Sequence, residues 1–208
     1  MINSLSDDQK RALSIYASDV MEWNESFNLT GASDLSEFET FHINDSLLPI
    51  EIIKNYIEEA LKSKSELTLA DLGCGAGLPL IPLSIALSDY PVSFYGIERS
   101  HKRCVFLKMC ISKLKTIIPI NISVIEKDID EVKDEFDIIV FRAFRTIGDV
   151  EKGISRILKS DGTVFAYKGE MNKTEKELLG LKYFNGEVLK LDKLDDRERT
   201  LMVLKKLK

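Results

Sequence analysis

Residues 67–77 read LTLADLGCGAG, and this stretch decides the fold. Its first part, Leu67–Leu72, is a short and mostly apolar run that is typical of a strand buried in a parallel sheet. Three glycines then follow at alternate positions: Gly73, Gly75 and Gly77. The next residues, 78–87 (LPLIPLSIAL), are apolar enough for a helix packed on a sheet. The sequence therefore predicts a strand, a glycine turn and a helix. The turn would lie at the carboxyl edge of an open α/β sheet, where such sheets bind ligands.

The spacing of the glycines indicates which ligand the turn serves. Glycine tolerates positive φ and lets the backbone approach a ligand with no Cβ in the way. A dinucleotide-binding turn needs the pattern G-x-G-x-x-G, but Leu78 occupies the sixth position here. A phosphate-binding loop needs a Lys-Ser or Lys-Thr pair after its glycines, and no such pair follows these glycines. One helix later, the apolar strand 92–97 ends at Glu98. A carboxylate about 20 residues past such a turn can accept hydrogen bonds from both hydroxyls of a ribose. We therefore predict a nucleoside cofactor; the plainer interpretation is a tight loop, with Glu98 capping the helix that begins near Ser100.

The remainder of the chain alternates strands and helices, as α/β folds do. Further strands are expected at 122–126, 136–141, 163–167, 187–191 and 200–204, and helices at 100–114, 148–158 and 171–180. A turn is expected at Asp161–Gly162. Because the last two strands can pair as a hairpin, we predict seven strands in a mostly parallel sheet that carries one antiparallel strand.

Residues 1–62 are predicted to form a helical extension packed on a core of residues 63–208, in one compact domain. Ser6 and Gln9 resemble a capping box at the start of the first helix. Two more helical stretches are expected at about 34–41 and 46–61. Turn residues mixed with apolar anchors are expected between the helices: Asn24, Phe27, Asn28, Leu29 and Thr30.

Composition and charge narrow the class of protein. Hydrophobic residues make up 44% of the chain and charged residues 30%, which is ordinary for a globular protein. No apolar run reaches the roughly 18 residues of a membrane span, and the charged N-terminal residues do not suit a secretory signal. Three cysteines without C-x-x-C spacing predict a reduced, cytoplasmic protein. The net charge of −5 argues mildly against nucleic-acid binding, although phosphate contacts need only a local basic patch.

Several segments together resemble one family. They are WNESFNLTG at 23–31, FHINDSL at 41–47, DLGCGAGLPLIPL at 71–83, IERSHKRCVFL at 97–107, FDIIVFRAF at 136–144, FAYKGE at 165–170 and RERTLMVLKK at 197–206. The glycine turn with IERSHKRCVFL resembles the S-adenosylmethionine site of the Rossmann-like methyltransferases. The whole set, which spans nearly the entire chain, resembles the bacterial ribosomal RNA small subunit methyltransferase G family, also called glucose-inhibited division protein B. This resemblance implies a Rossmann-like methyltransferase fold and S-adenosylmethionine as the cofactor.

The residues after the fourth predicted strand bear on the methyl acceptor. Exocyclic-amine methyltransferases usually carry an Asn/Asp-Pro-Pro-aromatic motif there, where this chain has Phe141–Phe144 (FRAF). None of the three cysteines lies in the Pro-Cys context of the carbon-5 pyrimidine enzymes. A ring nitrogen is therefore favoured, and the resemblance implies N7 of a guanine in 16S ribosomal RNA. Such a lone pair needs no general base, so the protein mainly positions the two reactants.

The resemblance also implies roles for individual residues. The methionine end of the cofactor should be enclosed by Gly73, Gly75, Gly77 and Leu78, and Asp71 should reach its amino group. Glu98 should bind the ribose. The adenine should be flanked by Asp128, Ile129 and Asp130. Arg142 should lie beside both the cofactor and the target base, while Lys168 and Arg199 should hold RNA. No metal is expected.

The implied partner is 16S ribosomal RNA, within the 30S subunit or an assembly intermediate, bound by a monomer without any membrane partner. Two alternatives stay open. One is a methyltransferase of the same fold that acts on a small molecule or a protein, which the acidic charge favours. The other is a non-catalytic nucleotide-binding protein, or a dehydrogenase, that has kept the glycine turn.

Overall fold

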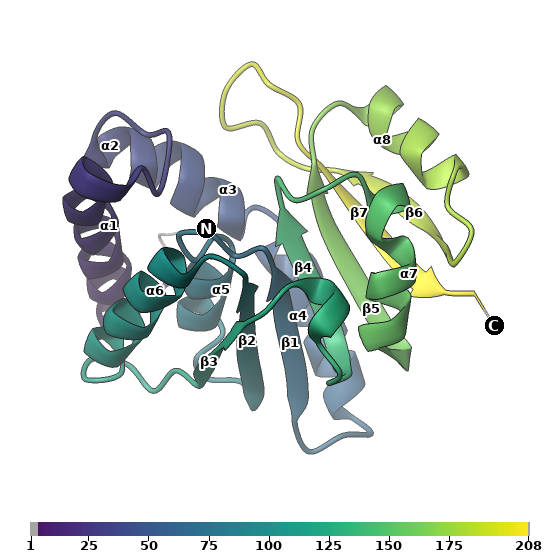
Figure 1. Ribbon diagram of the computed structural model, residues 1–208, viewed down its shortest axis with the longest axis horizontal. Helices are drawn as coiled ribbons and strands as arrows, with labels where there is room; N and C mark the ends of the chain where they lie inside the picture. Colours follow the sequence, from purple (N-terminus) through teal and green to yellow (C-terminus); the bar gives the residue numbers. More distant parts are fainter. Residues whose placement is uncertain (1–3, 208) are drawn as a thin grey trace.

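A computed structural model describes residues 4–207, and within them seven strands form one central sheet (Figure 1). The strands are β1 (Leu67–Leu72), β2 (Val92–Glu98), β3 (Ile122–Glu126), β4 (Phe136–Arg142), β5 (Leu158–Lys168), β6 (Phe184–Lys190) and β7 (Thr200–Lys206). Their order in the sheet is β3-β2-β1-β4-β5-β7-β6. Strand β7 runs antiparallel to both β5 and β6, and the other neighbouring pairs are parallel. The predicted fold class, with its single antiparallel strand and terminal hairpin, is confirmed.

Helices flank this sheet along the chain. They are α1 (Asp7–Phe27), α2 (Leu35–Phe38), a π-helical segment (Glu39–Ile43), α3 (Asn44–Leu47), α4 (Ile50–Leu61), α5 (Leu80–Ala86), α6 (His101–Leu114), α7 (Ile147–Ile157) and α8 (Met171–Leu179), with a 3₁₀ turn at Ile129–Glu131. In Figure 1, α1, α2 and α6 lie beyond the β3 side of the sheet, and α8 lies beyond the β6–β7 side. None of the helices in residues 4–207 is long and apolar enough to cross a membrane.

Both faces of the sheet are buried, because alternate residues of the central strands enter two separate cores. Leu69 of β1 and Val140 of β4 pack in one core with α1, α4, α5 and α6. The next residue on each strand, Ala70 of β1 and Phe141 of β4, packs in the other core with α7. A strand covered on both faces needs apolar residues at nearly every position, which is why β1 and β4 read as continuous apolar runs.

The N-terminal helices are held against the core by hydrogen bonds. The predicted capping box at Ser6 and Gln9 is confirmed. The Gln9 side chain also donates to the backbone carbonyl of Ile85 at 3.1 Å, and the buried Tyr16 hydroxyl donates to the carbonyl of Ala76 in the glycine turn at 3.0 Å. The first helix therefore contacts the glycine turn directly. The division of the chain after residue 62 stays a prediction.

Some predicted turns were wrong. Asn24 and Phe27 belong to α1, and the ring of Phe27 contacts that of Trp23 with centroids 5.0 Å apart. The helix ends at Asn28, whose backbone is in the left-handed region and whose N–H donates to the carbonyl of Asn24. The turn expected at Asp161–Gly162 lies inside β5, where the pairing with β4 shifts register. The helix expected at 46–61 is divided at Pro49 into α3 and α4.

Candidate functional site

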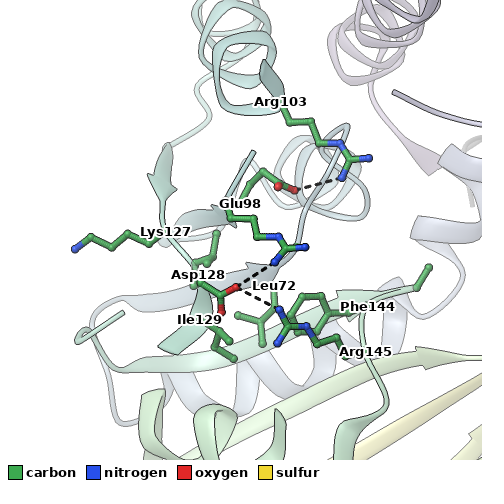
Figure 2. Close-up of a pocket in the computed structure, with 12 residues that line it drawn as sticks. Leu72, Glu98, Arg103, Lys127, Asp128, Ile129, Phe144 and Arg145 are labelled. Carbon is green, nitrogen blue, oxygen red and sulfur yellow. Dashed lines mark hydrogen bonds and ion pairs between the residues drawn. The ribbon is translucent and has the colours of Figure 1, made fainter. Parts of the chain in front are cut away.

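The topology creates a crevice between β1 and β4. The chain runs outward from β1 to β2 and β3 and then returns to the other side of β1 as β4. A pocket lies at the carboxyl ends of these four strands, where a reversal of strand order places ligands in open α/β sheets (Figure 2). It is lined by Leu72 of β1, Glu98 of β2, Asp128 and Ile129 after β3, and Phe144 after β4. We call it the crevice pocket.

The three glycines of the turn adopt backbone conformations that disfavour other residues. Gly73, Gly75 and Gly77 have φ angles of 67°, 56° and 95°. A Cβ at Gly73 would lie only 2.5 Å from the ring of Phe144, and one at Gly77 would lie 2.7 Å from Ile81. The turn therefore needs glycine both for its dihedral angles and for close packing.

Glu98 ends β2 and ties the glycine turn to the start of α6. Its buried carboxylate accepts hydrogen bonds from the Gly75 N–H at 3.0 Å and from the Ser100 N–H at 2.8 Å. The guanidinium of Arg103 lies 3.8 Å away on the pocket side (Figure 2). Glu98 therefore bonds the first N–H group at the start of α6 and also lines the pocket, so the two interpretations of this residue are compatible.

Asp128 forms ion pairs across the pocket. Its carboxylate lies 3.2 Å from Arg145 and 3.7 Å from Arg99, and Figure 2 shows Arg145 reaching it from the segment after β4. The buried side chain of Ile129 supplies an apolar surface beside it. The pocket thus combines an apolar wall with carboxylates and guanidinium groups.

Asp71 lies behind the glycine turn rather than on the pocket surface. It is fully buried; Oδ2 accepts a hydrogen bond from the Leu80 N–H at 2.9 Å, and Oδ1 has no partner among the described residues. Burial raises the pKa of this carboxyl to about 8, with a further contribution from Glu98, against the opposing effects of the Leu80 hydrogen bond and Arg142.

The structure brings some of the predicted cofactor residues together at the pocket and not others. Gly73, Glu98, Asp128 and Ile129 line it. The other predicted cofactor residues do not reach its lining: Asp71, Gly75, Gly77, Leu78, Asp130 and Arg142. Leu78 is buried in the core, and the Asp130 carboxylate faces Gly153 of α7 instead.

A second pocket collects the residues predicted to lie beside the target base or to hold RNA: Arg142, Lys168 and Arg199. We call it the basic pocket. These residues come from the carboxyl ends of β4 and β5 and from the start of β7, which are adjacent in the sheet. Ala143 lines both pockets, so they are neighbours. Its φ of 50° is unusual for alanine, and such strain clusters at functional sites.

Each basic residue in this second pocket has an acidic partner. Arg142 lies 2.9 Å and Arg199 2.6 Å from Asp45, while Lys168 lies 2.8 Å from Glu177. Asp45 lies within the segment FHINDSL, and no local pattern indicated a role for it. Arg99, Phe144 and Arg145 line the crevice pocket without having been predicted there, although their adjacency to Glu98 and Arg142 was a usable signal.

Comparisons with known proteins agree with this geometry. The GidB family model, described as rRNA small subunit methyltransferase G, matches residues 9–202. A ribosomal RNA small subunit methyltransferase G from Brachyspira hyodysenteriae is 31% identical, over 98% of this chain and 94% of that protein. One from Helicobacter pylori is 39% identical, over 77% of this chain and 82% of that protein.

Solved structures share the fold at low sequence identity. Magnesium protoporphyrin IX methyltransferase from Synechocystis, solved with bound SAM, superposes with a TM-score of 0.61 at 12% identity, over 97% of this chain and 99% of that chain. The tRNA (m1A58) methyltransferase from Aquifex aeolicus gives a TM-score of 0.58 at 18% identity, over 77% and 69% of the two chains. At these identities the likeness concerns the fold alone.

Proposed function

The chain belongs to the ribosomal RNA small subunit methyltransferase G family, and from this membership we propose that it methylates N7 of a guanine in 16S ribosomal RNA. It is an S-adenosylmethionine-dependent ribosomal RNA methyltransferase. The proposed substrate is the RNA within the 30S subunit or an assembly intermediate. We propose further that the enzyme acts as a monomer in the cytoplasm.

One observation carries this proposal: the crevice pocket and the basic pocket meet at Ala143. A methyl donor in the first would lie beside an RNA segment in the second. Arg142, Lys168 and Arg199 are cationic hydrogen-bond donors. RNA phosphates and base oxygens accept hydrogen bonds from such groups. The net charge of the whole chain is negative, so the local arrangement of these residues matters more than the sum.

The residues of the crevice pocket fit S-adenosylmethionine. Glu98 offers carboxylate oxygens for ribose hydroxyls, and Ile129 offers an apolar surface for adenine, with Asp128 next to it. Gly73 has no side chain, so the Phe144 ring packs directly on the backbone of the glycine turn and lines the pocket beside it. Among residues 4–207, one buried oxygen of Asp71 has no hydrogen-bond partner, which supports its proposed role as an acceptor for the amino group of the cofactor.

In this methyl transfer the main role of the protein is to position the two reactants. S-Adenosylmethionine supplies a methyl group on a sulfonium sulfur, and guanine N7 presents an unprotonated lone pair to it. Glu98 and the glycine turn orient the donor side, and the basic pocket orients the base. No residue has to remove a proton, and holding two reactants in line accounts for much of the acceleration in such reactions.

The test is transfer of tritiated methyl groups to 30S particles and to naked 16S RNA, both from a strain that lacks the modification. Mass spectrometry of the nucleosides then identifies the product. We expect 7-methylguanosine in the small-subunit RNA and none in matched 50S particles. Label in another nucleoside would overturn the N7 assignment, and an absence of label in both RNA samples would overturn the choice of substrate.

Calorimetry separates the proposal from a nucleotide-binding protein without activity. S-Adenosylhomocysteine should bind, and NAD should not. The reverse result would point to a dehydrogenase-like protein that uses the same glycine turn.

A further inference from the structure

The carboxylate of Asp45 receives guanidinium groups from two different strands. Nη1 of Arg142, at the end of β4, donates to Oδ2 at 2.9 Å. Nε of Arg199, just before β7, donates to Oδ1 at 2.6 Å. The three side chains are largely buried, with exposed fractions of 13% for Asp45, 16% for Arg142 and 14% for Arg199. Each carboxylate oxygen therefore serves one arginine in a site that excludes much of the water.

His42 completes the environment of Arg142. Nη2 of Arg142 lies 3.1 Å from Nδ1 of His42, and Nε2 of the same ring lies 3.3 Å from the Thr30 hydroxyl. Because a guanidinium can only donate, Nδ1 accepts and the ring is neutral, with its proton on Nε2. Burial and the nearby Arg142 both lower the pKa of His42, which agrees with the neutral form.

The local helix geometry explains why both residues face the same way. His42 lies in the π-helical segment and Asp45 at the beginning of α3, three positions later. Residues at this spacing lie on one face of a helix. Single π-helical turns of this kind occur often at functional sites. The N-terminal helices thus contribute side chains to a pocket whose walls come mainly from β4, β5 and β7.

We propose that Asp45 is a positioning residue of the basic pocket, which fixes Arg142 and Arg199 at the separation that the RNA substrate requires. This rests on the proposed function. A second carboxylate, that of Asp195, lies 3.6 Å from Arg199 and is shared with Arg197. These three arginines and two carboxylates leave one net positive charge, so the cluster can still attract an electron-rich oxygen of RNA. Among the described residues, the hydrogen bonds of Arg199 use Nε and Nη1 and leave Nη2 available. Without the carboxylate, the two cations repel each other and lose their shared acceptor.

The test is Asp45→Asn in the full chain. An amide has only one acceptor oxygen, so it can serve one arginine and presents an N–H group to the other. We expect kcat/KM for 30S particles to fall by about 30-fold or more, the loss that follows when a buried charge pair is broken. The affinity for S-adenosylhomocysteine should stay within about twofold, because Asp45 does not line the crevice pocket. Glu51→Gln removes the same charge from the exposed surface of α4 and is the matched control, with unchanged kinetics expected.

A double-mutant cycle with Arg199→Ala separates positioning from a general structural role. If Asp45 acts through Arg199, Asp45→Asn should cost less in the Arg199→Ala background than in the wild type. If Asp45→Asn does not unfold cooperatively, Asp45→Ser, which leaves room for water between the arginines, replaces it. Additive losses, or an equal loss of cofactor affinity, would overturn the positioning role.

The two proposals fail differently. Wild-type protein that transfers no methyl group to small-subunit RNA would refute the proposed function. Wild-type protein that transfers normally, together with Asp45→Asn protein that does the same, would refute only the role of Asp45.

Discussion

The Glu98 carboxylate accepts a hydrogen bond from the N–H of Gly75 at 3.0 Å, which joins the end of β2 to the glycine turn after β1. The two residues are 23 positions apart in the chain. Glu98 also accepts a hydrogen bond from the N–H of Ser100, the N-cap residue of α6. The same carboxylate therefore bonds the turn and the start of α6 while it lines the crevice pocket. A substitution at Glu98 therefore tests the pocket and its scaffold together.

Glu98→Gln should lower the affinity for S-adenosylhomocysteine by about tenfold, and Glu98→Ala should lower it further. The amide keeps one acceptor oxygen but loses the charge that strengthens its hydrogen bonds, a contribution of about 1.5–3 kcal/mol per bond to a charged group. Calorimetry measures the effect. Glu126→Gln is the control, because Glu126 ends the adjacent β3 and pairs with His101 at the surface. An unchanged affinity in Glu98→Ala would show that Glu98 does not bind the cofactor.

Gly73→Ala should displace Phe144 and abolish cofactor binding. The φ of 67° costs an alanine about 1–2 kcal/mol, and its Cβ would lie 2.5 Å from the Phe144 ring. Gly148→Ala is a matched control that should change the free energy of unfolding in the opposite direction. That glycine lies in α7 with open space around it, so alanine there should stabilise the chain by up to about 1 kcal/mol. Urea unfolding and calorimetry report both quantities, and normal binding by Gly73→Ala would contradict the described packing of the turn.

Arg142→Lys should reduce methyl transfer nearly as much as Arg142→Ala. A lysine keeps the charge, but its donors share one nitrogen, whereas the guanidinium bonds Asp45 through Nη1 and His42 through Nη2 in a fixed plane. We expect a loss of about 100-fold in kcat/KM with RNA, the scale of a 1 Å misplacement, and little change in cofactor affinity. Lys173→Ala, which removes a surface charge from α8, should behave like the wild type. Full activity in Arg142→Lys would show that only the charge matters.

Asp71 should make stability depend on pH. Its pKa is raised in the folded protein, from 3.8 to about 8, so the folded state holds a proton that the unfolded state releases between these values. The free energy of unfolding of the wild type should therefore fall, relative to Asp71→Asn, as the pH rises from about 4 to about 8. Urea unfolding of both proteins across this range measures the difference. A difference that does not change with pH would show that Asp71 is ionised throughout.

Local patterns in the chain determined most of the fold. The bounds predicted for β1 and β3 agree with the structure, and the strand that ends at Glu98 was placed correctly. These features follow from short-range physics: apolar runs for strands buried on both faces, and glycine where φ is positive. The same reasoning placed Glu98 next to the turn, because parallel strands end at one edge of the sheet.

Contacts between distant segments were decided only by the tertiary structure. Asp45 meets Arg142 and Arg199 across 97 and 154 positions of the chain, and Phe144 closes on Gly73 from the far side of the crevice. No local pattern encodes such pairs, since they depend on the strand order that makes β4, β5 and β7 neighbours. The chain alone therefore determined which residues carry charge or lack a side chain. Folding decided which of them share one carboxylate, because hydrogen bonds act over about 3 Å and only packing brings their partners that close.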